Sequence, residues 1–416
     1  MRQSLIGFVF IAASLAHAQV AKVEGASVAQ AKTAMCSSGV EADGYLYLSG
    51  QAATRPDGSL PRGFSEQANQ ALDNIKASVE ASGLTLEHVI YVQVYLEKME
   101  NYPAFAAVFK TRFPNVPPAG AVLGVSKLTH PAIQINAIAV RDLAGRKAVI
   151  PPDYDLEGPF SPGILTHDRL FVSAMQGKDP HTGKVPEDPA VQTDLALDGL
   201  KAVAEAAGLS MKHYVFVNPY LTQNIPGRIM NERYARRFEF GNTPGRATIE
   251  VASLPQQVQI EYTGVAVRDL SLRRSIRPKN MPPSPTASPC VFAGATLYCS
   301  AKSGFIPGPH GGVFGNTTAA QLRQTMRNQL DNLLEADMDF AQVVSSTVYL
   351  DDISDTTAFD KVFSEYFENG WPARTTLQQL PPASREPDSS GHYPDLEQMS
   401  LVAVKGFKMG PVKVCQ

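Results

Sequence analysis

Hydrophobic and polar residues follow a pattern that changes period several times within the first 140 residues. Residues 39–50 alternate as a hairpin of short strands, and residues 65–83 carry apolar side chains at helical spacing. A β-branched run at 88–96 predicts another strand, residues 103–113 predict a second helix, and residues 133–140 predict a closing strand. Two helices and about six strands predict an α+β unit with both helices on one face of a sheet.

This order of elements is repeated along the chain. The segment AIAVRDL at 137–143 recurs as GVAVRDL at 264–270, a shift of 127 positions, and more weakly as LVAVK at 401–405. A strand with the pattern aliphatic-Tyr-Leu recurs at 94–96, 219–221 (with proline in the first place) and 348–350. We therefore expect three tandem modules, at 19–144, 145–271 and 272–416. Proline-containing segments at 145–152 and 273–289 read as the linkers between them.

The N-terminus has the features of a targeting signal. Arg2 precedes an apolar run at 5–13, and Ala16-His17-Ala18 forms an A-x-A cleavage motif. The apolar run is too short for a membrane-spanning helix, which needs about 20 residues. We expect residues 1–18 to be a signal peptide cleaved near Ala18, which leaves a secreted or periplasmic protein with no membrane anchor.

Composition narrows the possible partners. The 416 residues include 37 basic and 40 acidic side chains, so the net charge of −3 provides no positive field for nucleic acid. The eight histidines show no HExxH motif, and we expect no metal site. Export permits disulfides, and Cys290 and Cys299 flank a possible two-residue turn, so they can pair across a hairpin. Four cysteines allow three pairings, and four free thiols are a further alternative.

Several motifs recur with the modules. They are the strand end Ser-Gly-Gln at 49–51, a Leu-Asp-Asn helix, Pro-x-Arg at 244–246 and 372–374, and Ile-Glu-x-x-x-Val-Ala-Val at 260–267. As a set they resemble the Rid family, the YjgF-like reactive-intermediate deaminases also called endoribonuclease L-PSP. The resemblance implies a chorismate-mutase-like fold for each module. Family members assemble as trimers with a ligand cleft between neighbours, so this chain is expected to be a monomeric pseudo-trimer.

The resemblance also implies which residues form the site. In the family, the Pro-x-Arg arginine grips the carboxylate of an imino or keto acid, and a glutamate on the last strand positions the attacking water. Arg246 and Glu261 of module 2 match these two catalytic positions. A guanidinium binds a carboxylate through two parallel hydrogen bonds, and a carboxylate can orient water and move protons, so no cofactor is required. The substrate-binding positions in module 2 are matched by Phe160, Ser173 and Asn231.

The other two modules depart from this pattern. Module 3 keeps Arg374 as a candidate substrate-binding residue, but Gln398 stands at the water position and Asp360 replaces the asparagine. Glu397 is one residue out of register and is expected to face the other side of its strand. Module 1 has lost all three groups, with Gly120, Gln134 and Ala106 in their places. We therefore expect one competent cleft, one that binds acids and one that is structural. Cys36 and Cys290 align with Phe160 at the cleft mouth.

Two functions remain open at this point. The first is hydrolysis of a 2-imino or enamine acid to a 2-keto acid and ammonia. The alternative is an exported, non-catalytic binding module for small carboxylates, which export favours because the imines cleared by this family arise chiefly in the cytoplasm. An interdomain salt bridge between Arg246 and Glu261 without chemistry is a third interpretation of that pair. Ribonuclease activity is disfavoured because the chain is slightly acidic.

Overall fold

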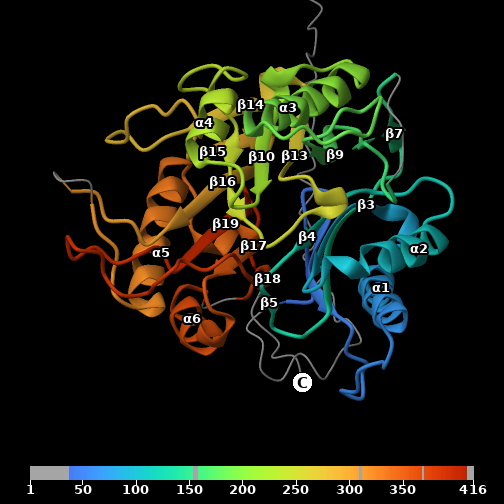
Figure 1. The fold of residues 1–416 in the computed structure, drawn as a ribbon, viewed down its shortest axis with the longest axis horizontal. Helices are drawn as coiled ribbons and strands as arrows, with labels where there is room; N and C mark the ends of the chain where they lie inside the picture. The colour runs from blue at the N-terminus through green and yellow to red at the C-terminus, as the bar shows by residue number, and fades with distance from the viewer. Residues whose placement is uncertain (1–36, 153–157, 309–311, 368–369, 410–416) are drawn as a thin grey trace, which may run out of the picture.

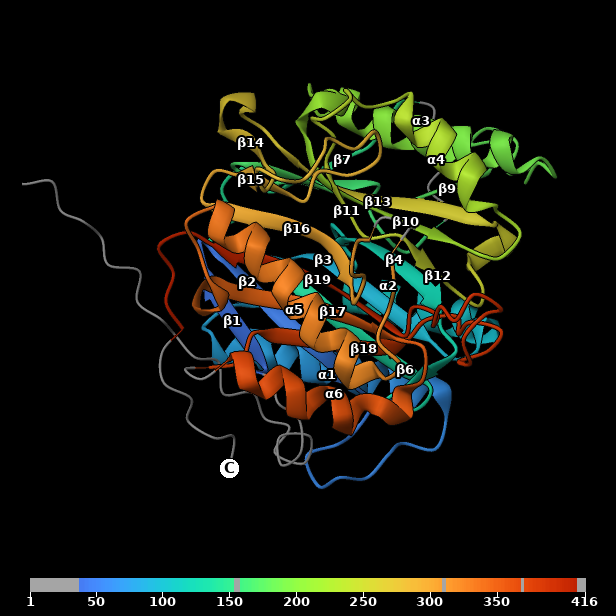
Figure 2. The ribbon, with the colours of Figure 1, turned by 90° about the vertical axis from the view of Figure 1, so that its left-hand side faces the viewer.

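The computed structural model describes residues 37–152, 158–308, 312–367 and 370–409. The predicted signal peptide, Cys36 and Cys415 lie outside these ranges. Three sheets surround a common centre, and a pair of helices covers the outer face of each sheet (Figures 1 and 2). The predicted α+β class and the three tandem modules are therefore confirmed. We use the names module 1, module 2 and module 3 for the three sheets with their helices, in chain order.

Module 1 is a five-stranded sheet in the order β1-β2-β6-β3-β4. Its strands are β1 (Gly39–Ala42), β2 (Tyr45–Ala52), β3 (Val89–Leu96), β4 (Ala119–Gly124) and β6 (Ile133–Val140), and its helices are α1 (Phe64–Ala81) and α2 (Tyr102–Arg112). Neighbouring strands are antiparallel except β3 and β4, which are parallel.

Module 2 repeats this core within a larger sheet in the order β7-β8-β9-β13-β10-β11, with β12 also pairing to β10. Its strands are β7 (Lys147–Val149), β8 (Gly163–Leu165), β9 (Arg169–Gln176), β10 (Tyr214–Leu221), β11 (Gly245–Arg246), β12 (Ile249–Glu250) and β13 (Ile260–Val267). Its helices are α3 (Pro189–Ala206) and α4 (Gly227–Ala235).

Module 3 has the strand order β14-β15-β16-β19-β17-β18, and β5 (Lys127–Leu128) from module 1 extends its edge. Its strands are β14 (Arg273–Ile276), β15 (Cys290–Ala293), β16 (Thr296–Ser303), β17 (Val343–Leu350), β18 (Ala373–Gln378) and β19 (Glu397–Val404). Its helices are α5 (Thr318–Glu335) and α6 (Thr356–Phe363). Part of each predicted linker is an edge strand, β7 in the first and β14 in the second, and residues 277–289 continue outside the sheet.

Helix α1 shows why the sequence pattern predicts these elements well. Its apolar residues Ala68, Leu72, Ile75 and Val79 are fully buried against β2 and β6, as their helical spacing requires. Gly83 follows the helix with φ +72°, a conformation that glycine adopts without strain. The sheets contain five, seven and seven strands among the described residues, where about six were predicted.

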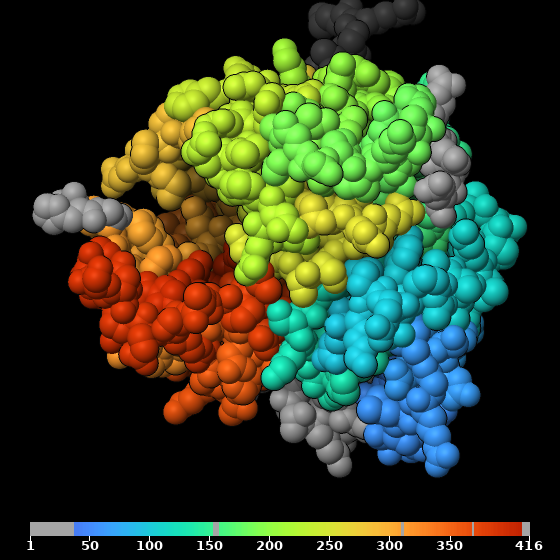
Figure 3. Space-filling model, in the orientation of Figure 1, coloured from blue at the N-terminus to red at the C-terminus, as the bar shows by residue number. Residues whose placement is uncertain are grey.

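The modules contact one another in a closed ring. Strand β4 of module 1 packs on β9 of module 2, β11 of module 2 on β16 of module 3, and β18 of module 3 on β2 of module 1. Residues of all three modules line a small cavity of about 110 Å³ at the centre. The space-filling view shows the three modules in mutual contact, with a hollow where the yellow-green surface of module 2 meets the orange surface of module 3 (Figure 3).

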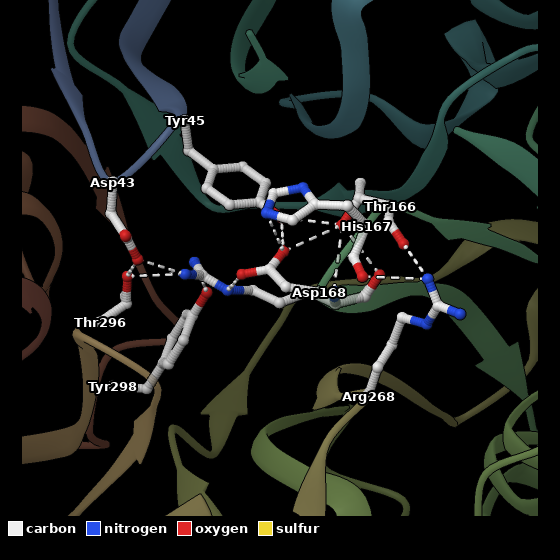
Figure 4. Close-up of polar contacts among 9 residues, drawn as sticks. Asp43, Tyr45, Thr166, His167, Asp168, Arg268, Thr296 and Tyr298 are labelled. Atoms are coloured by element: carbon white, nitrogen blue, oxygen red, sulfur yellow. Dashed lines mark hydrogen bonds and ion pairs between the residues drawn. The ribbon is translucent and has the colours of Figure 1, made fainter. Parts of the chain in front are cut away.

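One arginine links the three modules at a single junction. Tyr45, Arg169 and Thr296 occupy equivalent positions, because each is the first residue of its module's second hairpin strand. The Arg169 side chain is fully buried, and its guanidinium contacts both neighbouring modules. Its partners Asp43, Tyr45, Thr296 and Tyr298 are labelled in Figure 4. The contacts are Asp43 Oδ2 at 2.5 Å, Thr296 Oγ1 at 2.9 Å, the Tyr298 hydroxyl at 3.2 Å and the Tyr45 ring centroid at 4.3 Å. Three different residues therefore meet where a symmetric trimer would place three copies of one.

Candidate functional site

A serine of each module is hydrogen-bonded to the neighbouring module that precedes it in the ring. The bond reaches the strand that carries Gly120, Arg246 or Arg374, the three residues at the position of the Pro-x-Arg arginine, which we call the arginine position. The serine hydroxyl accepts a hydrogen bond from a backbone N–H of that neighbour and donates one to a carbonyl twelve residues earlier in its own module. The N–H to hydroxyl pairs are Gly120 with Ser173 at 2.8 Å, Arg246 with Ser300 at 2.8 Å, and Arg374 with Ser49 at 2.9 Å. The same bond, repeated three times, fixes the geometry of three intermodule clefts.

The glutamate positions are equally well fixed by strand register. Each lies opposite the tyrosine of the aliphatic-Tyr-Leu strand: Gln134 opposite Tyr95, Glu261 opposite Tyr220, and Gln398 opposite Tyr349. Each cleft therefore combines the arginine position of one module with the glutamate position of the next. A module's own arginine and glutamate positions belong to two different clefts.

The cleft between modules 2 and 3 contains Arg246. Together with Lys302 and Gln398, Arg246 lines a cavity of about 360 Å³. Arg246 Nη1 donates a 2.8 Å hydrogen bond to Asn231 Oδ1 on α4, and the guanidinium lies 5.1 Å from the centroid of the Tyr234 ring. Burial lowers the pKa of Arg246 from its ordinary value, and no carboxylate in the described parts of the chain pairs with it. This cleft therefore presents a guanidinium that Asn231 positions and that has no anionic partner among the residues the structure describes.

The cleft between modules 1 and 2 contains Glu261. Phe160, Ser173 and Glu261 line it together with Gly120 of β4, around a cavity of about 360 Å³. The Glu261 side chain is fully buried, and neither carboxyl oxygen makes a well-formed hydrogen bond to a described residue. Burial raises the pKa of Glu261 to about 8, and the Gln176 side chain offsets part of the rise. Glu261 is therefore mostly protonated at neutral pH.

The third cleft, between modules 3 and 1, contains Arg374. Arg374 Nη2 lies 2.6 Å from Asp360 Oδ1, and the Arg374 side chain is only 5% exposed. The guanidinium also packs over the rings of Phe359 and Phe363. Asp360 therefore provides the Arg374 guanidinium with a carboxylate partner from its own module. Gln134 stands at the glutamate position of this cleft.

The expectation that Arg246 and Glu261 form one competent cleft is wrong. Arg246 lies on the edge strand β11, which packs on module 3, whereas Glu261 lies on β13 beside β9, which packs on module 1. The interpretation of this pair as a salt bridge is wrong for the same reason. The structure brings Arg246 together with Asn231, and Glu261 together with Phe160 and Ser173. None of the three described clefts combines an arginine with a glutamate at these positions.

Comparison with known proteins identifies the fold that carries these clefts. The sequence model described as Endoribonuclease L-PSP matches residues 27–141, 153–268 and 280–383, which is more than half of the chain. The chain belongs to the endoribonuclease L-PSP family. The resemblance inferred from the repeated motifs is confirmed.

Individual members of the endoribonuclease L-PSP family are similar to single modules. The 2-iminobutanoate/2-iminopropanoate deaminase of Escherichia coli strain K12 is 34% identical over 113 residues, which cover 27% of this chain and 88% of that protein. The putative reactive intermediate deaminase TdcF of the same strain is 32% identical over 113 residues, which again cover 27% of this chain and 88% of that protein. The crystal structure of Escherichia coli TdcF with bound serine is 28% identical, covers 30% of this chain and 99% of that chain, and has a TM-score of 0.28.

Two details of module 3 of this L-PSP chain match expectation. Cys290 lies opposite Cys299 and forms a disulfide with it, as the hairpin pattern allows. Glu397 faces helix α5, where its carboxylate accepts a 2.5 Å hydrogen bond from Thr325, on the side of the strand opposite to Gln398. The alignment of Cys290 with Phe160 is wrong. Ser161 and Ser288 are equivalent, because each accepts the hydrogen bond of its module's cleft serine, so the residue of module 3 that corresponds to Phe160 is Ala287.

Sequence reasoning missed one residue of the L-PSP clefts. Lys302 lines the Arg246 cleft. The sequence motif could have revealed it, because Ser300-Ala301-Lys302 corresponds to Ser49-Gly50-Gln51 of module 1. Within the described ranges, no three His, Cys, Asp or Glu side chains are arranged to hold a metal ion. The helices in those ranges also include none that is long and apolar enough to cross a membrane.

Proposed function

We propose that this chain hydrolyses small 2-imino acids to 2-keto acids and ammonia in the cleft between modules 2 and 3. The observation that carries the proposal is the state of Arg246, which lines a cleft without a carboxylate partner among the described residues. Arg374 differs because Asp360 already pairs with it. The activity for which the Escherichia coli 2-iminobutanoate/2-iminopropanoate deaminase is named supports the same substrate class.

Arg246 has the chemistry to hold such a substrate. Asn231 accepts a hydrogen bond from one N–H of the guanidinium and so fixes the orientation of the guanidinium. The other N–H groups remain for a carboxylate. A planar guanidinium binds a carboxylate through two parallel hydrogen bonds, and both become stronger in a partly desolvated cleft. Binding through the carboxylate leaves C2 of the substrate, the carbon of the imine, free to react.

Glu261 does not take part in this cleft. It cannot direct water onto a substrate held by Arg246, because the two side chains line different cavities. Gln398 occupies the corresponding position beside Arg246, where its amide donates a 2.7 Å hydrogen bond to Gln379. A glutamine can hold a water molecule but cannot accept its proton at neutral pH. Phe160 and Ser173 also belong to the Glu261 cleft, so Arg246 and Asn231 remain as the proposed binding pair.

A second function is favoured by Gln398 itself. Without a carboxylate at the water position, the cleft is suited to bind a small 2-keto acid without converting it. The predicted signal at residues 1–18 fits such a role, and we propose that the chain is exported. We also propose that it is a monomer, since the three modules already close a ring.

Turnover by matched variants separates these possibilities. An amino-acid oxidase generates 2-imino acids in situ, and keto-acid release is followed above spontaneous hydrolysis. Hydrogen bonds to charged groups contribute about 1.5–3 kcal/mol, so Arg246→Ala is expected to lower kcat/KM about 10- to 100-fold. Arg374→Ala and Glu261→Gln are the controls and should stay near the wild-type rate. Equal rates for wild type and Arg246→Ala would refute the proposal, and saturable binding of 2-ketobutyrate without turnover would favour the binding module.

A further inference from the structure

Lys302 distinguishes the Arg246 cleft from the other two. The strand-end motif reads Ser-Gly-Gln at 49–51 in module 1, Ser-Ala-Met at 173–175 in module 2 and Ser-Ala-Lys at 300–302 in module 3. The serine of each motif makes the same intermodule hydrogen bond, so the residue two places later occupies an equivalent position in each module. An amine therefore stands only in the module 3 copy, which contributes to the Arg246 cleft.

Lys302 lies beside the cleft at an irregular point of its strand. The pairing of β16 with β19 shifts register between Cys299 and Lys302, which marks an irregularity of the β-bulge type. Such irregularities redirect side chains and are common beside binding sites. Lys302 lines the same cavity as Arg246 and Gln398, opposite the guanidinium-bearing strand of the neighbouring module. The amine and the carboxylate clamp therefore come from two different modules.

The surroundings of Lys302 favour a reactive amine. The side chain is half-buried, and no carboxylate of the described chain lies within ion-pair distance of it. Burial disfavours the charged form and lowers the pKa of Lys302 from its ordinary value. A larger fraction of the side chain is then the neutral amine, which is the nucleophilic form. A lysine that served only to attract carboxylates would gain nothing from this loss of charge.

We propose that Lys302 is a nucleophile that forms a Schiff base with a 2-imino or 2-keto acid held by Arg246. This inference rests on the proposed function and supplies the step that Gln398 cannot. The amine attacks C2, a bond forms between C2 and Nζ, and the two protons of the amine move in turn from Nζ to the substrate nitrogen. The C2–N bond then breaks, and ammonia leaves. Water adds to C2 of the resulting Schiff base, the C2–Nζ bond breaks, and the 2-keto acid and the free lysine amine are released.

Trapping with borohydride tests this step on the whole protein. The purified chain is incubated with 2-ketobutyrate, which condenses with an amine by loss of water, and borohydride reduces the Schiff base to a stable secondary amine. Mass spectrometry of the intact chain and of its peptides then locates the adduct. We expect one adduct per chain, on the peptide that contains Lys302. Arg246→Ala should strongly reduce the yield, because the keto acid is no longer held.

Three variants make the test specific. Lys302→Gln reproduces the side chain present at position 51 of module 1 and should abolish both the adduct and turnover with a retained melting temperature. Lys302→Arg keeps the positive charge but forms no Schiff base, so retained turnover in this variant would overturn the inference. Lys178→Gln changes a lysine of the cleft between modules 1 and 2 and should leave the adduct on Lys302 unchanged.

The two proposals fail in different ways. Turnover that depends on Arg246 but survives Lys302→Gln would refute the role of Lys302 and leave the proposed function standing. Adducts spread evenly over many lysines would overturn the assignment to Lys302 in the same way. Absence of both turnover and 2-ketobutyrate binding would refute the proposed function and the inference together.

Discussion

Replacing Glu261 with glutamine is expected to stabilise the protein at neutral pH. The Glu261 carboxyl is fully buried, and burial raises its pKa from 4.5 to about 8. Neither oxygen has a well-formed hydrogen bond within the described structure, so little compensates the charged form. Glutamine has nearly the same shape and carries no charge at any pH. The substitution therefore removes the cost of ionising a buried acid and changes little else.

The magnitude follows from the two pKa values. Between pH 4.5 and pH 8, the folded state keeps a proton that the unfolded state has released. The contribution of the Glu261 carboxyl to the free energy of unfolding is therefore fully present below pH 4.5 and is lost as the pH rises towards 8. One pKa unit corresponds to about 1.4 kcal/mol, so the wild-type chain loses about 3 kcal/mol by pH 7. The loss levels off at about 5 kcal/mol above pH 8.

Urea unfolding between pH 5 and pH 8 measures this effect. The difference in unfolding free energy between Glu261→Gln and wild type should be small at pH 5 and reach about 3 kcal/mol at pH 7. Glu250→Gln is the matched control, because Glu250 is exposed on the nearby strand β12 and the same substitution should leave the pH dependence unchanged. If the unfolding free energies of wild type and Glu261→Gln changed with pH in parallel, the claim that the buried Glu261 carboxylate lacks compensating interactions would be refuted.

Three further changes test the clefts and their junction. Gln398→Glu restores a carboxylate beside Arg246 and should raise the deamination rate in the oxidase-coupled assay, since general acid–base catalysis contributes about 10²- to 10⁴-fold; an unchanged rate would contradict the assignment of Gln398 to the water position. Gly120→Arg should destabilise the chain by about 1–3 kcal/mol in urea unfolding instead of completing the Glu261 cleft, because its Cβ would lie 2.8 Å from the Val92 carbonyl oxygen. Arg169→Ala should lower the free energy of unfolding by about 3 kcal/mol, which is near the lower end for breaking a buried ion pair because Asp43 is partly exposed. A melting temperature equal to that of the wild type would show that the junction is dispensable.

Local features of the fold were predictable because they depend on neighbouring residues. The burial of one face of α1 follows from helical spacing, and the opposite directions of Glu397 and Gln398 follow from the alternation of side chains along a strand. The pairing of Cys290 with Cys299 follows from a two-residue turn between two short strands. In each of these cases the relevant contacts lie within one module.

The composition of the clefts was not predictable from one module. Arg246 and Glu261 lie in a single module, but the ring arrangement turns one towards module 3 and the other towards module 1. The contacts between modules, among them the serine bonds, reveal which arginine position faces which glutamate position. Arg169 was missed for a similar reason, since its partners Asp43 and Thr296 belong to modules 1 and 3.

The three clefts now differ in a way that has a chemical meaning. One has a buried glutamate and a glycine in place of the arginine, and one has an arginine already paired with an aspartate. The third has an arginine beside a lysine, and no carboxylate among the described residues pairs with that arginine. Fusing three modules into one chain permits this, because each copy of the cleft can change independently. In a symmetric trimer, a substitution such as that at position 302 would appear in all three clefts.

The number of ligand sites per chain tests this account most directly. Calorimetric titration of the purified protein with 2-ketobutyrate gives both the stoichiometry and the affinity. We predict one site per chain, lost in Arg246→Ala and retained in Arg374→Ala and Glu261→Gln. Three equivalent sites, or one site that survives Arg246→Ala, would contradict the claim that the cleft between modules 2 and 3 carries the function.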